Sequence, residues 1–260
     1  MTEKILETAR VVQDYINESY NLFAKKFLNC DEHRFDIKQE CVAKSAFWVT
    51  KKRYGQWIIN DGGLECEKLD VKGLDIVRSS FPPAFRDFMT RVLKAILHNY
   101  EKDKIDQFIL KFKGSLSDHD INDIALPSGV KGMKKYLGTK SGGIFRTPKS
   151  GTPAHVKASL AYNDLLSYYK SKHLEPIRNA SKIKWVYLKN NPLQLDALAY
   201  KGYDDPKEVM DFINQYIDRD KIFERALSKK IQMFYDALSW DMPVDKVNSI
   251  ERFFQHKQEL

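Results

Sequence analysis

A short run of cations beside an aromatic residue is the most distinctive chemistry in the sequence. Lys51, Lys52 and Arg53 are followed directly by Tyr54, in a stretch rich in β-branched and aromatic residues. If this stretch is a strand, alternation places Lys52 on the face of Tyr54 and the other two cations on the opposite face. A lysine beside an aromatic ring can probe a nucleic-acid groove. Long cationic side chains also decorate the solvent face of ordinary hairpins, so both interpretations stay open.

A second set of cations lies in a stretch without acidic residues. From Ile124 to Asn163 the sequence contains no Asp or Glu, and glycines are frequent within it. The cations of this stretch are Lys131, Lys134, Lys135, Lys140, Arg146, Lys149 and Lys157. Distributed cations among glycines, which allow close approach of the backbone, suit binding to a phosphate backbone. An ordinary solvated loop has the same composition, and the residues alone do not separate the two.

The sequence predicts neither a catalytic site nor a metal site. The three cysteines Cys30, Cys41 and Cys66 form no Cys-x-x-Cys pair, and Cys30-x-x-His33 is only a weak metal-like pair. Asp204-Asp205 resembles a pair of catalytic carboxylates, but Pro206 follows them. That order predicts an Asp cap with Pro at the first helical position. No Ser/His/Asp or Cys/His spacing suggests a nucleophile.

The elements that must position these residues are predicted from hydrophobic periodicity, which indicates an α+β fold. The loop-rich part is residues 127–153, and a domain boundary near Ser79 divides residues 1–78 from residues 79–260. Helices are predicted at 4–28, 84–97, 105–114, 154–169, 206–216 and 220–238. Strands are predicted from Ala46 to Asn60, again after Gly63, and in a hairpin of residues 182–189 and 193–200.

The composition is that of a globular, basic protein. The 260 residues include 43 Lys+Arg against 35 Asp+Glu, which gives a net charge of +8, and 43% of the residues are hydrophobic. No stretch approaches about 18 uninterrupted apolar residues, and acids stand near Met1, where a signal peptide is basic and then apolar. We therefore expect a cytoplasmic protein without a membrane partner, in the host cytoplasm if the protein is viral.

Two motifs at the right separation resemble the family B DNA polymerases. Lys51 to Tyr54 matches the family's Lys-Lys-x-Tyr hairpin, which closes the palm against the primer-template duplex. The run from Leu69 to Pro82 matches the Lys-Gly-hydrophobic segment that leads into the thumb. Residues 155–163 and 182–188 are similar to a thumb helix and the following strand of the enzymes from large tailed bacteriophages. The resemblance implies that residues 1–78 are the C-terminal palm portion and residues 79–260 a mainly helical thumb with a small β-hairpin subdomain.

The resemblance also implies which residues bind DNA. Lys52 would reach the minor-groove edge of the primer-terminal pair, and Tyr54 would pack beside the primer. The expected DNA-binding residues are Lys51, Lys52, Arg53, Tyr54, Lys72, Lys131, Lys134, Lys135, Lys140, Arg146 and Lys157. Near the C-terminus, Ile250, Phe253 and Phe254 resemble the sliding-clamp-binding peptide, although Val247 replaces its usual leading Gln. A last helix that docks on its own thumb fits the same spacing.

The catalytic motifs of the family do not occur in the sequence. Phosphoryl transfer needs carboxylates that hold two Mg²⁺ ions, and neither Asp-x-x-Ser-Leu-Tyr-Pro nor Asp-Thr-Asp is present. We therefore expect no catalytic residue in this chain and Mg²⁺ only at the aspartates of a partner chain that carries the exonuclease, the fingers and the catalytic palm. The function predicted is the C-terminal part of a split polymerase. The alternative is a stand-alone DNA-binding or clamp-binding accessory protein derived from a thumb.

Overall fold

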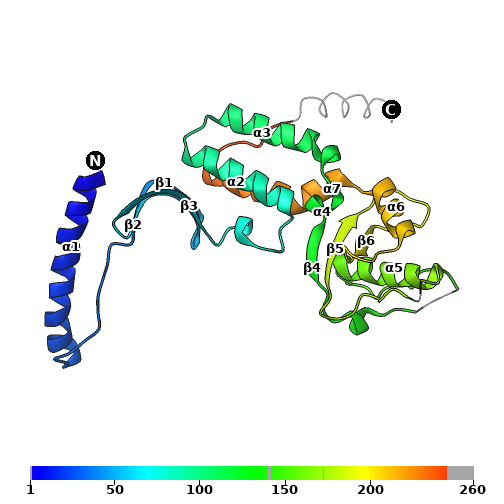
Figure 1. Ribbon diagram of the computed structural model, residues 1–260, viewed down its shortest axis with the longest axis horizontal. Coiled ribbons are helices and arrows are strands. Elements are labelled where there is room, and N and C mark those ends of the chain that lie inside the picture. The colour runs from blue at the N-terminus through cyan, green and yellow to red at the C-terminus, as the bar shows by residue number, and fades with distance from the viewer. Residues whose placement is uncertain (1, 140–141, 172, 245–260) are drawn as a thin grey trace.

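The computed structural model describes residues 2–139, 142–171 and 173–244, and its mixed helices and antiparallel sheets agree with the predicted α+β class. Figure 1 shows an elongated arrangement with helix α1 (Thr2–Phe23) at one end. A three-stranded sheet and then a group of helices follow it, and a second sheet with helix α5 (Ala154–Tyr168) lies at the other end. Among the described residues, no helix is long and apolar enough to cross a membrane.

Helix α1 is amphipathic but buries none of its residues. It continues as a π-helical turn, Ala24–Leu28, so the predicted helix of residues 4–28 is confirmed. The chain then runs back along α1 in residues 29–40. Asn17 of α1 binds both backbone groups of Ile37, at 2.8 and 3.0 Å, and the Gln13 side chain accepts a hydrogen bond from the amide of Gln39 at 2.9 Å. Hydrogen bonds therefore attach this extended segment to α1.

The first sheet is an antiparallel meander of β1 (Cys41–Thr50), β2 (Arg53–Asp61) and β3 (Leu64–Lys72). The predicted strand after Gly63 is confirmed as β3, whereas the single strand predicted from Ala46 to Asn60 is wrong, because a turn at residues 51–52 divides this stretch into β1 and β2. Gly62 and Gly63 connect β2 to β3, and both have positive φ angles, 58° and 91°. Glycine adopts these angles without the steric cost that a Cβ brings, which explains the sharp reversal at this position.

Helices α2 (Pro83–Leu97) and α8 (Lys229–Ala237) pack against this sheet, and α3 (Lys102–Gly114) packs against α2. Helix α8 continues α7 (Arg219–Phe223) through the π-helical turn Glu224–Ser228. Phe47 of β1 meets Phe234 of α8 at a ring distance of 5.3 Å. A Cβ built on Gly55 of β2 would lie 2.8 Å from a methyl carbon of Leu93. The sheet and the helices therefore belong to one hydrophobic cluster.

The second sheet has the order β4-β5-β6, with bounds Leu126–Gly129, Lys182–Tyr187 and Ala197–Tyr200. The predicted hairpin is confirmed as β5 and β6, but β4 falls within the stretch predicted to be loop. Pro127 is compatible with strand formation because β4 is an edge strand, in which the N–H that proline lacks is not needed for pairing. Helix α5 packs against β5 and β6, and α6 (Lys207–Tyr216) follows them.

Short elements connect these parts. The 3-10 turn Asp75–Val77 precedes α2, and the 3-10 turn Leu116–Asp118 and helix α4 (Ile121–Ile124) lead from α3 to β4. A further 3-10 turn, Met133–Tyr136, stands at the start of the long connection to α5. The predicted cations lie mainly in two segments. One connects β1 to β2, and the other connects β4 to α5.

Candidate nucleic-acid interface

Lys51 and Lys52 form the tight turn between β1 and β2, which we call the Lys51–Lys52 turn. Thr50 pairs with Arg53 across the turn, and Lys52 has a positive φ of 63°. The prediction that strand alternation sorts these lysines onto opposite faces is therefore wrong, because neither lies in a strand. Both side chains are exposed at the tip of the hairpin. A pair of cations at a protruding tip can enter a groove that a flat strand face cannot.

Gly73 packs directly against the backbone of the Lys51–Lys52 turn. A Cβ built on Gly73 would lie 2.2 Å from the carbonyl oxygen of Lys52, and Gly73 has a φ of 68°. Real Cβ atoms essentially never approach another atom below 3.0 Å, so only glycine fits here without a backbone shift. The Arg53 side chain also donates a hydrogen bond to the Gly73 carbonyl oxygen at 3.3 Å. The two motifs found in the sequence thus meet in space.

Asp75 is the centre of a group of charges that sequence analysis did not identify. Its carboxylate contacts the guanidinium of Arg53 at 3.3 Å, that of Arg78 at 3.0 Å and Nζ of Lys230 at 2.7 Å. We call these four residues the Asp75 cluster. The Asp75 side chain is only 12% exposed, so the ion pair with Lys230 of α8 is shielded from water. One carboxylate against three cations leaves an excess of positive charge beside the Lys51–Lys52 turn.

Tyr54 and Lys72 lie opposite each other in the register of β2 and β3. Tyr54 is half-buried, whereas Lys72 is exposed and contacts the Asp70 carboxylate at 3.2 Å. The hydrogen bond that the Lys72 ammonium donates to the Asp70 carboxylate raises the pKa of Lys72. The structure therefore brings the predicted residues Lys51 to Tyr54 and Lys72 together at one end of the first sheet.

The other predicted cations form a separate group around α5. Lys131, Lys134 and Lys135 are exposed on and beside the 3-10 turn Met133–Tyr136, and Lys157 is exposed on α5. The side chain of Asn179 accepts a hydrogen bond from the amide of Met133 at 2.9 Å, which holds this turn in place. Lys140 lies outside the described residues. Figure 1 shows that α2 and α3 lie between this group and the first sheet.

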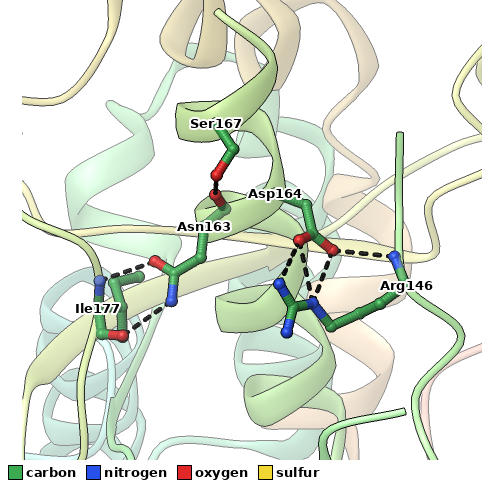
Figure 2. Close-up of polar contacts among 5 residues, drawn as sticks. All are labelled: Arg146, Asn163, Asp164, Ser167 and Ile177. Atoms are coloured by element: carbon green, nitrogen blue, oxygen red, sulfur yellow. Dashed lines mark hydrogen bonds and ion pairs between the residues drawn. The ribbon is translucent and has the colours of Figure 1, made fainter. Parts of the chain in front are cut away.

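Arg146 differs from the other predicted cations because it is already paired. Its guanidinium donates to both carboxylate oxygens of Asp164 at 2.7–3.1 Å, and its amide donates to the same carboxylate at 2.9 Å, as Figure 2 shows. The Asp164 side chain is 1% exposed. The hydrogen bonds that the guanidinium donates to the Asp164 carboxylate raise the pKa of Arg146. This geometry favours a structural role, in which Arg146 fastens the loop before α5 to that helix.

The neighbouring Asn163 makes a second connection of the same kind. Its amide side chain binds both the N–H and the C=O of Ile177, each at 2.8 Å (Figure 2). Adjacent residues of α5 therefore fasten two different segments, the loop that precedes the helix and the chain that leads to β5. Backbone groups buried beside a helix need such partners, because an unpaired one costs about 1–3 kcal/mol.

The residues that resembled catalytic or metal groups have structural roles. Asp205 accepts hydrogen bonds from the amides of Lys201 and Gly202 at 2.9 and 2.7 Å. It therefore closes a turn before α6, and the predicted Asp cap with Pro at the first helical position is wrong, because Pro206 itself is the N-cap. His33 binds the side chain of Asn21 instead of a cysteine. Within the described ranges, no group of three His, Cys, Asp or Glu residues could hold a metal ion.

Comparison with known proteins identifies the class to which this arrangement belongs. The model of the DNA polymerase family B matches residues 5–238. This match spans both sheets and all the helices between them, so the chain belongs to DNA polymerase family B.

Two individual relatives match a shorter part of the chain. The DNA polymerase of Desulfurococcus sp. (strain Tok) is 29% identical over 102 residues, which are 38% of this chain and 12% of that protein. The human protein SSX8 is 30% identical over 102 residues, which are 38% of this chain and 54% of that protein. The chain thus spans about half or less of the length of these curated relatives.

Proposed function

We propose that this chain is the C-terminal palm portion and thumb of a split family B DNA polymerase of the tailed-bacteriophage type. It binds the primer-template duplex and completes DNA-directed nucleotidyl transfer only with a partner chain. The partner supplies the exonuclease, the fingers and the aspartates that bind Mg²⁺. Membership of the family supports this proposal, as does the absence of the family's catalytic carboxylate motifs from the sequence.

The observation that carries the proposal is the contact between Gly73 and the Lys51–Lys52 turn. It presents Lys52 on a rigid tip with excess positive charge behind it. In the minor groove, purine N3 and pyrimidine O2 are acceptors at the same place whichever base is present. A lysine at the tip can donate to them without reading the sequence, which is what a replicative polymerase requires. Lys51 and Lys72 would neutralise neighbouring phosphates.

The exposed side of α1 supports the existence of a partner chain. Val11, Tyr15 and Leu22 fall on one face of the helix and are 69%, 73% and 74% exposed. We call them the α1 apolar face. Exposed apolar surface of this kind marks an interaction site. Its position within the palm portion suits a partner that carries the rest of the palm. The residues proposed to bind the sliding clamp, Ile250, Phe253 and Phe254, lie outside the described residues.

One observation favours the accessory-protein alternative. Residues from Leu74 to Tyr235 supply nearly all of the main hydrophobic cluster, so this part has a core of its own. A chain that folds alone and binds DNA without a polymerase partner would have such a core. The alternative predicts a chain that is monodisperse by itself and is recovered without a polymerase partner.

The partner can be tested by native mass measurement of the complex recovered with tagged chain from its original source. We expect a one-to-one complex with a chain that contains Asp-Thr-Asp and Asp-x-x-Ser-Leu-Tyr-Pro. Val11→Glu/Leu22→Glu should abolish its recovery, because charges replace the apolar contact, whereas Arg10→Glu elsewhere on α1 should not. Recovery of the wild-type chain alone and monodisperse would contradict the split-polymerase proposal and leave the accessory role.

Lys52→Ala should lower duplex affinity by about tenfold, because hydrogen bonds from charged donors contribute about 1.5–3 kcal/mol. Primer extension by the reconstituted enzyme should fall with it. Lys44→Ala, which removes an exposed lysine of β1 away from the turn, is the matched control. For the wild type, contact with about six phosphates would give a log-log salt slope of about −5. Unchanged affinity and extension in Lys52→Ala would remove Lys52 from the interface.

A further inference from the structure

A hollow of about 670 Å³ lies beside α5, far along the chain from the Lys51–Lys52 turn. Four segments line it: the loop before α5, α5 itself, the β5–β6 connection and α7. We call it the α5 hollow. A volume of this size accommodates a small ligand or one unit of a polymer.

The lining of the α5 hollow carries more positive than negative charge. Arg146 and Asp164 line it, but they neutralise each other through the bidentate pair. The other charged lining residues are Lys157, Lys221 and the exposed Asp196. Within the described part of the chain, the structure shows no ion pair for either lysine. Two cations against one carboxylate leave a positive hollow.

Lys221 is held in position by an aromatic ring. Its Nζ lies 5.2 Å from the ring centroid of Tyr187, which also lines the hollow. A cation over an aromatic face is stabilised without being neutralised, because the ring carries no net charge. Lys221 therefore keeps its full positive charge in a hollow that Lys157 of α5 also lines. Gln194 adds a neutral hydrogen-bonding group to the same lining.

We propose that the α5 hollow binds a phosphate group, with Lys157 and Lys221 as its cationic ligands. This inference rests on the proposed function and deepens it, because a phosphodiester of the bound DNA is the phosphate that such a chain would meet. It adds Lys221 and Gln194 to the proposed DNA interface and assigns Lys157 to a phosphate in the α5 hollow. A free phosphate or mononucleotide has the same chemistry, so the test must separate the two sources.

The first arm measures the salt dependence of the full chain's affinity for a labelled primer-template. Each phosphate contact contributes about −0.9 to the log-log slope. Because both lysines hold the same phosphate, Lys157→Gln/Lys221→Gln should make the slope less steep by about 1. The matched control is Lys94→Gln/Lys104→Gln, since Lys104 also lies over a ring, that of Tyr100 at 5.8 Å, but outside the hollow. Lys157→Arg/Lys221→Arg should restore the slope. The same slope in the Gln variant and the wild type would exclude the DNA strand as the source of the phosphate, and the second arm would then decide whether the site exists.

The second arm titrates the full chain without DNA with inorganic phosphate and with a mononucleotide. The reporter is the fluorescence of Trp185, whose ring lies 4.9 Å from that of Tyr187. If the fluorescence change saturates in the wild type and is lost in the Gln variant, the hollow binds a free phosphate. If neither ligand changes the fluorescence and the first arm shows the expected slope change, the hollow binds a phosphate of the DNA strand. No effect of the Gln variant in either arm would overturn the site.

The two proposals fail in different ways. If Lys52→Ala leaves duplex binding unchanged while the hollow variant flattens the slope, the proposed role of the Lys51–Lys52 turn is wrong and the hollow stands. If Lys52→Ala weakens binding while the hollow variant behaves like its control in both arms, the duplex function stands and the hollow binds no phosphate.

Discussion

Gly73→Ala should destabilise the protein by about 3 kcal/mol and weaken duplex binding at least as much as Lys52→Ala does. Two costs combine. A non-glycine residue in the left-handed region costs about 1–2 kcal/mol, and the new Cβ would meet the Lys52 carbonyl oxygen at 2.2 Å. The second cost can be relieved only by moving the Lys51–Lys52 turn. Denaturant unfolding and duplex titration of the same preparation measure both effects.

Gly62→Ala is the matched control for this substitution. Gly62 also has a positive φ, 58°, and belongs to the same sheet, but a Cβ there would find no atom within 4 Å. We expect only the conformational cost of about 1–2 kcal/mol and unchanged affinity for DNA. Equal effects of the two substitutions on affinity would show that the contact between Gly73 and the turn has no part in DNA binding.

Asp164→Ala should have the largest effect on stability around α5, a loss of about 3 kcal/mol. Removing one partner of a buried ion pair leaves the other charge uncompensated, which typically costs about 3–5 kcal/mol. We expect a loss at the lower end of this range because Arg146 is 26% exposed and can turn partly toward water. The amide of Arg146 also loses its acceptor. Denaturant unfolding measures the loss, and limited proteolysis should cut the loop before α5 sooner than in the wild type.

Two further variants test whether the effect of Asp164→Ala comes from the loss of the buried ion pair with Arg146. Arg146→Met/Asp164→Leu should recover much of the lost stability, because apolar replacement of a buried pair is often neutral. Asp36→Asn removes an exposed ion pair with Lys38 and should change stability by less than about 1 kcal/mol. If Asp164→Ala costs no more than Asp36→Asn, the pair does not hold the loop.

The sequence predicts the helices and the second sheet's hairpin well because their signals are local. Hydrophobic periodicity and the prolines at its start mark α2, Pro153 stands directly before α5, and Asn190-Asn191-Pro192 marks the connection between β5 and β6. Strand β4 was missed because its evidence is non-local: Leu126 pairs with Trp185, far along the chain. Pro127 and Gly129 locally indicate a loop, and only the pairing with β5 makes this segment a strand.

The candidate site shows the same limit. The cations of the Lys51–Lys52 turn were identified by type, but the turn itself was hidden within an unbroken run of strand-forming residues. A lysine gives no turn signal, and its left-handed conformation depends on Gly73 packing behind it. The partner of Arg146 was missed because Asp164 lies just beyond the acid-free stretch. Charge counts show where cations are, whereas pairing decides which of them are free.

The Asp75 cluster has a consequence for the order of folding. The β1–β2–β3 meander needs only short-range loop closure, which is fast, so the hairpin can form early in synthesis. Lys230, however, comes from the last described helix, as does Phe234, which packs on Phe47 of β1. The contacts that fix the base of the hairpin therefore form only after nearly the whole chain has been made. A nascent chain that lacks α8 would carry the lysine tip on an unsupported sheet, so the proposed DNA binding should appear only once α8 has been made.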